Sequence, residues 1–149
     1  MVDCTFCRIL TNDLPASFVF RDEQCAAFMD IQPVNSGHVL VVPLRHAAEL
    51  SVLDAPTAAH LMTVAQRVTA ALRASPLRCD GVNLLLADGE AAGQEVFHVH
   101  LHVIPRFSAD GFGFRFGPEY GNPPARAQLE LAAAQIRAAL ADETDRPQG

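Results

Sequence analysis

The sequence predicts an α+β fold with a five-stranded antiparallel sheet and two main helices. Strand-like apolar runs are grouped at the start of the chain and again in its second half, and one long helical pattern follows each group. Strands that come in groups, instead of alternating singly with helices, are typical of this class. The chain has 149 residues, enough to bury a hydrophobic core, and we expect a single domain over residues 1–149.

Three strands are expected before the first long helix, after a short helical or turn segment. Residues 17–21 and 25–29 are apolar runs separated by Asp22-Glu23-Gln24, a pattern that predicts a hairpin. Residues 37–43 are rich in valine, and β-branched residues favour a strand.

The two helices are predicted from the spacing of their apolar residues. Residues 54–74 begin with Asp54, a good N-cap, and repeat apolar residues at helical spacing. Their apolar positions are Leu61, Val64, Val68 and Leu72. Residues 125–142 are rich in alanine and have a similar repeat at Leu129, Ala133, Ile136 and Leu140. Between the helices, residues 81–86 predict a fourth strand, and the Gly- and Pro-rich residues 111–124 predict an irregular excursion.

The fifth strand carries three histidines at alternate positions, His98, His100 and His102. Because side chains alternate along a strand, the three imidazoles are expected on one face. The other face is expected to be filled by Phe97, Val99, Leu101 and Val103. Neighbours on one face lie about 6.5–7 Å apart and the outer pair about 13 Å apart, so two of these rings can share one metal ion but all three cannot.

This geometry leaves two interpretations of the histidine strand. Two of the rings ligate a catalytic metal, or the middle ring is a nucleophile flanked by helpers. The loop before the strand, residues 88–95, contains small residues that let backbone N–H groups approach an anion closely. The loop favours the second interpretation, with phosphate as the bound anion.

Composition and charge narrow the partners and the location. The net charge is −6 and no basic run occurs, which argues against a general nucleic-acid binder. No apolar stretch approaches the roughly 18 residues of a membrane span, and the N-terminus lacks the features of a signal peptide. We therefore expect a cytoplasmic protein with no membrane partner, whose four cysteines are thiols or metal ligands and not disulfides.

The segment from Cys4 to Arg106 resembles the histidine triad (HIT) family of nucleotide hydrolases and transferases. The resemblance rests on the motif His98-Val99-His100-Leu101-His102-Val103-Ile104, its lead-in Gly93-Gln94-Glu95-Val96-Phe97 and its exit Pro105-Arg106. It also covers residues 30–46. It implies a HIT-like fold in which residues 1–15 form a zinc and nucleotide-lid segment. Residues 107–149, a Gly/Pro excursion and the C-terminal helix, match less tightly.

The resemblance also assigns roles to residues. The catalytic triad would be His98, His100 and His102, with His100 attacking the α-phosphorus to form a covalent nucleotidyl-imidazole and His102 donating to a phosphate oxygen. His38 would support the first triad histidine, and the alternative is a core histidine with its hydrogen bonds satisfied. Residues expected at the nucleotide are Phe6, Leu14, Phe28, Asp30, Ile31, Gly93, Gln94, Glu95, Val96, His100 and His102. Among them, Asp30 would accept from ribose hydroxyls, and the apolar residues would enclose the base or simply form ordinary core.

Cys4 and Cys7 have the two-residue spacing at which both sulfurs can bind one tetrahedral ion. A redox pair has the same spacing, but it is expected near a βαβ unit, which this chain lacks. The resemblance to bacterial members with such a pair implies a closed zinc site completed by His46 and His98. The zinc ion would then be structural, and the alternative is a pair of free thiols.

Two positions depart from the usual family pattern. Ala87 stands where the family usually has Asn or Gln, and the missing hydrogen bond is worth roughly 0.5–1.5 kcal/mol. Glu95 stands where the nucleoside-phosphoramidase branch often has Ser. The chain also has no Trp, so that branch's tryptophan-containing tail is missing. These changes affect the choice of substrate and the rate more than the reaction class.

The resemblance therefore implies a hydrolase that binds purine nucleotides and forms a homodimer. Its substrates would be dinucleoside polyphosphates or nucleoside phosphoramidates, cleaved at the α-phosphate. The alternatives are a nucleotide-binding regulatory protein with little catalysis, a zinc-dependent hydrolase that uses the triad as ligands, and a purely structural zinc module.

Overall fold

The computed structural model describes residues 4–144. By its internal contacts the chain divides into two units, Met1–Phe112 and Gly113–Gly149. The single domain expected from the sequence stays a prediction. In chain order the elements are α1 (Thr5–Leu10), β1 (Phe18–Arg21), β2 (Cys25–Met29), β3 (Val39–Pro43), η1 (Leu50–Val52), α2 (Ala55–Ala74), β4 (Gly81–Leu85), η2 (Glu90–Ala92), β5 (Leu101–Arg106) and α3 (Arg126–Thr144).

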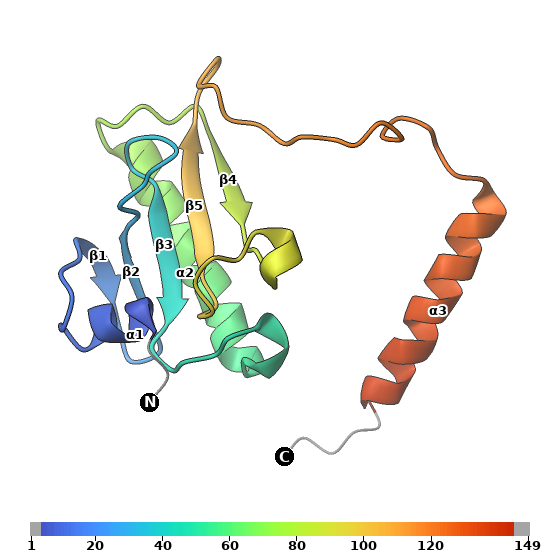
Figure 1. Cartoon of the computed structure of the whole chain (residues 1–149). Coiled ribbons are helices and arrows are strands. Elements are labelled where there is room, and N and C mark those ends of the chain that lie inside the picture. The colour runs from blue at the N-terminus through green and yellow to red at the C-terminus, as the bar shows by residue number, and fades with distance from the viewer. Residues whose placement is uncertain (1–3, 145–149) are drawn as a thin grey trace. The chain divides into compact units, whose positions relative to one another are not determined.

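The five strands form one sheet in the order β1-β2-β3-β5-β4, and every neighbouring pair is antiparallel (Figure 1). With α2 and α3 as its two long helices, the structure confirms the predicted α+β class. The strands in the middle of the sheet bring residues from far apart in the chain together. In particular, Leu40 on β3 lies opposite both Phe28 on β2 and His102 on β5.

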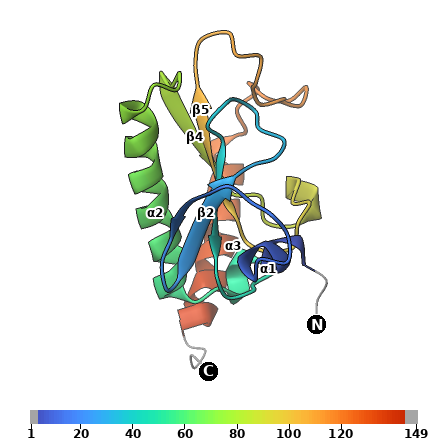
Figure 2. The same ribbon diagram turned by 90° about the vertical axis from the view of Figure 1, so that its left-hand side faces the viewer.

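Helix α2 covers one face of the sheet, and α1 lies on the other face (Figure 2). Asp54 caps α2 as predicted, because its side chain accepts a hydrogen bond from the Thr57 N–H at 2.9 Å. The apolar side of α2 packs on valines of the central strands, such as Val41 and Val103, which are fully buried. Each such side chain contributes about 1.5–3 kcal/mol of burial free energy.

The second core lies on the α1 face of the sheet. Phe6, Ile9 and Leu10 of α1 pack there on Phe28 and Leu40 of the sheet. The short helix α1 is too short to be stable alone, so its position depends on this packing. The strand residues on this face are the ones that share it with His102, which places α1 beside the histidines.

The histidine strand is shorter than the sequence predicts. β5 begins at Leu101, and the residues before it leave the ladder because the Val99 N–H donates to the Ala47 carbonyl at 2.7 Å. The alternation of faces still holds, since Val99, Leu101 and Val103 are all in the α2-side core. The prediction was wrong for Phe97, which is 48% exposed, because the chain bends just before the histidines.

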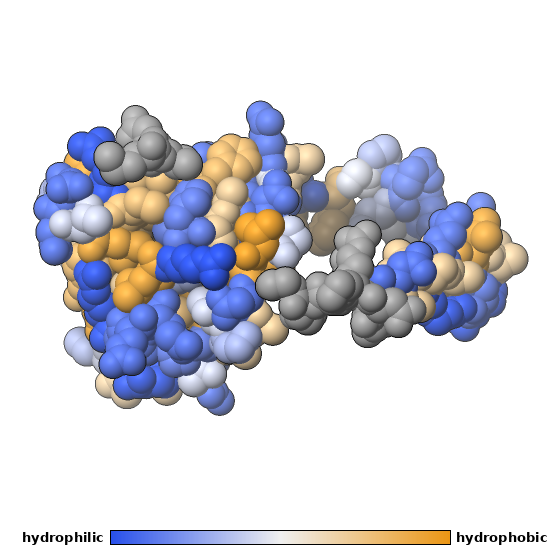
Figure 3. All heavy atoms as spheres, turned by 90° about the horizontal axis from the view of Figure 1, so that it is seen from below, coloured by the Kyte–Doolittle hydropathy of each residue, from blue (hydrophilic) through white to orange (hydrophobic). Residues whose placement is uncertain are grey.

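The second unit contains α3, and residues 113–125 before it form neither helix nor strand, as the sequence predicts. The apolar repeat of α3 is exposed, and apolar residues stand among hydrophilic ones on this helix in Figure 3. The exposed members of the repeat are Leu129, Ile136 and Leu140, and Leu131, outside the repeat, is exposed as well. Within residues 4–144, none of the helices combines the length and the apolar character that crossing a membrane requires.

Candidate active site and metal centre

Two of the three triad histidines are buried, and the third is partly buried. His98 is fully buried and His100 is 6% exposed, and both precede β5, while His102 lies on it. The rings of His100 and His102 are edge to face, with centroids 4.8 Å apart. All three lie on the α1 side of the sheet, as the period-two pattern predicts.

The backbone fixes the protonation pattern of His100. Its Nδ1 lies 2.7 Å from the carbonyl oxygen of His98. A carbonyl only accepts, so Nδ1 must carry the ring proton of a neutral imidazole, and Nε2 is left with a lone pair. The Phe6 ring lies edge to face with His100 at 5.2 Å and restrains its orientation.

A second chain of contacts fixes His102. The Val34 N–H donates to Nδ1 of His38 at 3.1 Å, so His38 carries its proton on Nε2. That Nε2 lies 2.9 Å from Nδ1 of His102 and donates to it. His102 is therefore protonated on Nε2, which makes it a donor. The expectation that His38 supports the first triad histidine is wrong, because His38 contacts the third one.

Burial keeps the rings of His38 and His102 neutral. Desolvation, with a smaller contribution from the neighbouring His100 and His38, lowers the pKa of His102 to about 4. Desolvation likewise lowers the pKa of His38, although Asp30, whose Oδ2 is 3.6 Å from His38 Nε2, opposes the shift. At neutral pH both rings act as neutral hydrogen-bonding groups.

A cavity of about 500 Å³ opens between α1, the sheet and the loop before β5. This volume lies in the range of small-molecule sites, about 300–1,000 Å³. Nine of the residues expected at the nucleotide line it: Phe6, Phe28, Asp30, Ile31, Gly93, Glu95, Val96, His100 and His102. Its wall also includes His38 and Ala87, which the resemblance had assigned to the site, and Leu40, which the sequence analysis had not singled out.

Leu14 and Gln94 are the two expected nucleotide residues outside this wall. Leu14 packs instead at the edge of the α1-side core. The Gln94 amide is buried and braces the loop: its oxygen accepts from the Gly89 N–H at 2.7 Å, and its nitrogen donates to the carbonyls of Ala48 and Val96. With these contacts made, Gln94 acts on the cavity through the backbone of its neighbours.

The four predicted metal ligands meet in one cluster. The ligand atoms of Cys4, Cys7, His46 and His98 all lie within 4.8 Å of one another. Cys7 Sγ is 3.4 Å from His46 Nδ1 and 3.6 Å from His98 Nδ1, and Cys4 Sγ is 3.5 Å from the same His98 atom. Sulfur and nitrogen ligands on a tetrahedral zinc ion lie about 3.6 Å apart, given bonds of about 2.3 and 2.0–2.1 Å. The residues present therefore fit a zinc ion.

Hydrogen bonding around the cluster leaves a ligand atom of His98 free to bind a metal. His98 Nε2 donates to the Pro43 carbonyl at 2.9 Å, which leaves Nδ1 unprotonated and directed at the two sulfurs. Without a metal, burial and, to a smaller extent, the adjacent Cys4 raise the pKa of the Cys7 thiol to about 11. Four ligands close the coordination shell and leave no position for a reactive water, which is typical of a structural site.

The sequence profile of the HIT domain matches residues 11–109. The chain belongs to the HIT family. An uncharacterized HIT-like protein of Borreliella burgdorferi is 43% identical over 118 residues, which are 78% of this chain and 85% of that protein. Adenylylsulfatase HINT3 of Arabidopsis thaliana is 32% identical over 108 residues, 72% of this chain and 54% of that protein.

Solved HIT structures share the fold. A HIT family protein from Bacillus anthracis has a TM-score of 0.84 and 35% identity, covering 93% of this chain and 97% of its own. A Zn-bound histidine triad family protein from Mycobacterium smegmatis has a TM-score of 0.72 and 39% identity, covering 92% and 97%. The histidine triad nucleotide-binding protein from Candida albicans has a TM-score of 0.80 and 26% identity, covering 94% and 99%.

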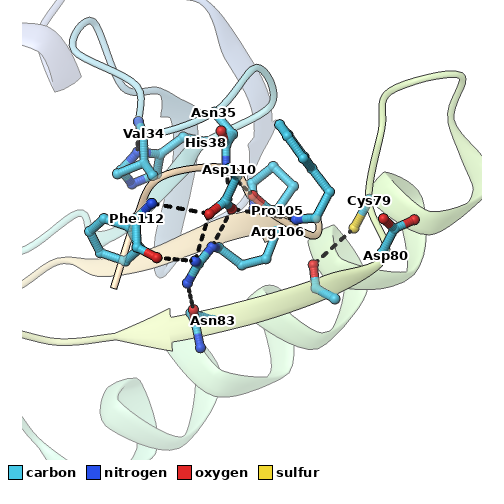
Figure 4. Close-up of polar contacts among 12 residues, drawn as sticks. Val34, Asn35, His38, Cys79, Asp80, Asn83, Pro105, Arg106, Asp110 and Phe112 are labelled. Atoms are coloured by element: carbon cyan, nitrogen blue, oxygen red, sulfur yellow. Dashed lines mark hydrogen bonds and ion pairs between the residues drawn. The ribbon is translucent and has the colours of Figure 1, made fainter. Parts of the chain in front are cut away.

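Sequence reasoning missed a buried polar network behind His38 in this HIT domain (Figure 4). The Asp110 carboxylate, 3% exposed, accepts from Arg106 at 2.6 and 2.8 Å and from Asn35 Nδ2 at 2.8 Å. Asn35 also donates to the Pro105 carbonyl at 2.9 Å, and its own carbonyl accepts from the His38 N–H. These partners lie 70 and 75 positions from Asn35 in the chain, so no local pattern could indicate the network.

A second cavity, of about 330 Å³, lies between α2 and the first strands. Among the described residues that line it there is no His, Cys, Asp or Glu. The one hydroxyl among these described residues, that of Ser75, therefore has no base beside it in the cavity wall, and they offer no acid, base or metal ligand of these types. The histidine cavity is the candidate active site.

Proposed function

We propose that this HIT protein hydrolyses a bond at the α-phosphate of a nucleotide through a covalent intermediate on His100. The substrates are dinucleoside polyphosphates or nucleoside phosphoramidates. The observation that carries the proposal is the hydrogen bond from His100 Nδ1 to the His98 carbonyl, because it leaves an unprotonated Nε2 on a ring that lines the cavity. An imidazole held in this form is a ready nucleophile.

The proposed reaction has two steps and uses His100, His102, water and protons exchanged with solvent. His100 Nε2 forms a bond to the α-phosphorus, the bond to the leaving group breaks, and the leaving group takes the electron pair and a proton from solvent. Water then attacks the same phosphorus, the phosphorus–Nε2 bond breaks with its electron pair returning to the ring, and the proton of the water passes to solvent. The His102 Nε2–H would donate to a phosphate oxygen as charge builds in both steps.

The other end of the cavity suits a nucleoside. Phe6 and Phe28 form an edge-to-face pair, with centroids 5.5 Å apart, on the apolar wall. Ile31 is 90% exposed at the same cavity, a cost that a bound base would offset by covering it. Asp30 accepts from the Gln32 N–H through Oδ1 at 2.8 Å, and its remaining acceptor capacity suits ribose hydroxyls.

Two relatives support this substrate class. One relative is named an adenylylsulfatase, and one structural neighbour is named a nucleotide-binding protein. Zinc at the cluster of Cys4, Cys7, His46 and His98 would supply structural cross-linking. It would hold His98, whose carbonyl orients the nucleophile.

The test is intact-mass spectrometry after a brief acid quench with adenosine phosphoramidate or diadenosine tetraphosphate. Wild type is expected to carry an added nucleotidyl group, while His100→Ala is expected to carry none and to release no product. His60→Ala is the control, since His60 lies on α2, pairs with Asp22 and does not line the cavity. A steady turnover by His100→Ala equal to wild type would overturn the proposal.

The second candidate is a nucleotide-binding regulatory protein with little catalysis. Ala87 favours it, because this cavity residue offers no hydrogen bond to the phosphates or the leaving group. Nucleotide binding without an adduct and without product would support this candidate.

A further inference from the structure

The charges around the histidine cavity favour one class of leaving group, an inference that rests on the function proposed above. Asp30 and Glu95 are the acidic residues of the cavity wall. Among the described residues that line it there is no arginine, and the whole sequence contains no lysine. Phosphate sites in proteins usually supply such cations, so this cavity is unusual for a polyphosphate.

Two arginines of the same unit are engaged elsewhere. Arg106 is held by the Asp110 carboxylate, and Arg21 donates to the Leu10 carbonyl at 3.0 Å. Neither lines the cavity. These cations are therefore fixed in contacts that serve the fold.

The cavity residues His38 and His102 do not replace them. Burial lowers the pKa of His38 and lowers that of His102 to about 4, so both are neutral at pH 7. A neutral N–H is a sufficient partner for the single charge of an α-phosphate. It supplies no counter-charge for a chain of further phosphates, which would also meet the two carboxylates.

Glu95 is well placed to act on the leaving group. It follows the braced Gln94 and lines the cavity from the loop between β4 and β5, whereas Phe6 lines it from α1 and Phe28 from β2, two strands away from β5 in the sheet. The aromatic wall, with Phe6 and Phe28, is where a base would lie. The part of the substrate on the Glu95 side is then the group that departs.

We infer that Glu95 selects substrates whose leaving group carries a positive charge, so that nucleoside phosphoramidates of cationic amines are preferred over substrates with anionic leaving groups such as further phosphates. In this reaction the phosphorus–nitrogen bond breaks and the amine leaves with the electron pair and one proton from solvent. The second, charged end of the amine lies near the Glu95 carboxylate.

The experiment uses three adenosine 5′-phosphoramidates whose leaving amines differ only at the far end: diaminobutane, butylamine and aminobutyrate. The cationic substrate is expected to have a kcat/KM about 10-fold above the anionic one at low ionic strength, from the attraction and repulsion of single charges across a few ångströms of partly aqueous space. In Glu95→Gln this ratio is expected to fall to about twofold or less. Glu90→Gln is the matched control, because Glu90 is an exposed glutamate five positions away that does not line the cavity.

The two proposals fail in different ways. If wild type turns over all three substrates at one rate, or if Glu95→Gln keeps the full ratio, the role of Glu95 is overturned while the hydrolase stands. If none of the three is hydrolysed, or if His100→Ala hydrolyses them as well as wild type, the proposed function itself falls, and this inference falls with it. A ratio lost equally in Glu90→Gln would point to the net charge of the surface and would also overturn it.

Discussion

His102 acts, in the proposed reaction, only through the proton on its Nε2. The contact from His38 Nε2 to His102 Nδ1, 2.9 Å long, sets that proton's position. We expect His102→Gln to lower kcat by about 10²–10³-fold, the usual loss when one donor to a developing oxyanion is removed. KM should change far less, because the interaction strengthens in the transition state. Steady-state kinetics with adenosine phosphoramidate would check this, and an equal loss of kcat in His60→Gln would contradict it.

The same residue makes a prediction about pH and stability. Burial lowers the pKa of His102 from 6.5 to about 4. Between these values the unfolded chain binds a proton that the folded protein does not, so the free energy of unfolding falls as the pH decreases, by about 2–3 kcal/mol down to pH 4.5. Urea unfolding at pH 7.5 and 4.5 should show a smaller loss for His102→Gln than for wild type. An equal loss of unfolding free energy in the two proteins would mean that groups other than His102 cause the destabilisation at acidic pH.

At the scale of elements, the loop between β2 and β3 keeps the His102 Nε2–H in place as a hydrogen-bond donor. The Val34 N–H that sets His38 comes from this loop, and Asn35 ties the loop to Asp110 and to the end of β5 (Figure 4). If the hydrogen bonds of Asn35 were lost, the loop would be free to move the Val34 N–H away from His38. His38 and then His102 would be able to change tautomer. Asn35 is therefore a positioning residue that touches neither cavity nor substrate.

We expect Asn35→Ala to lower kcat by about 10-fold, since a displacement of 1 Å can cost up to about 10²-fold. Nitrogen NMR shifts of the His102 ring should then report a mixture of tautomers, which a loss of stability alone would not produce. Asp80→Asn is the control, because Asp80 is 66% exposed and pairs only loosely with Arg78 at 4.0 Å. Wild-type ring shifts in Asn35→Ala would contradict the positioning role.

The elements that could be predicted from sequence are those with a local signature. The Asp54 cap, the apolar repeat of α2 and the valines of β3 each act on near neighbours, and the structure confirms all three. The start of β5 could not be predicted, because it depends on the Ala47 carbonyl far back in the chain.

Within the site, too, the residue types could be predicted from the sequence but their backbone partners could not. The histidine spacing and the pair Cys4 and Cys7 show which residues take part. The partners that decide their chemistry are backbone groups: the carbonyls of His98 and Pro43 and the N–H of Val34. Every residue has such groups, so no residue type in the sequence could identify them.

At the scale of the whole molecule, the sheet ends in a strand suited to pairing with a second copy. β4 is at one edge of the sheet, and Leu84 on it is 42% exposed. An open edge strand is a template for pairing, which fits the homodimer that the HIT resemblance implies. Light scattering after gel filtration should give twice the chain mass of 16.0 kDa, and Leu84→Arg should shift the mass toward one chain. A monomeric wild type would contradict the dimer.

The cluster of Cys4, Cys7, His46 and His98 joins the start of the first unit to the triad, since Cys4 and His98 are 94 positions apart. A metal that binds only the folded chain stabilises it by about 3–4 kcal/mol at 100 to 1,000 times its dissociation constant. We expect one zinc ion per chain, lost in Cys7→Ser, with a clear fall in Tm in that variant and in wild type treated with a chelator.

Cys79→Ser is the matched control for the zinc prediction, because the Cys79 thiol donates to the Gly81 carbonyl and lies outside the cluster. It should keep the metal and respond to the chelator as wild type does. The ion would hold His98, whose carbonyl orients His100. The metal-free protein should therefore also lose turnover, and this loss should follow the loosening of α1 from the sheet. Full turnover and an unchanged Tm after verified removal of the metal would show that packing alone sets the nucleophile.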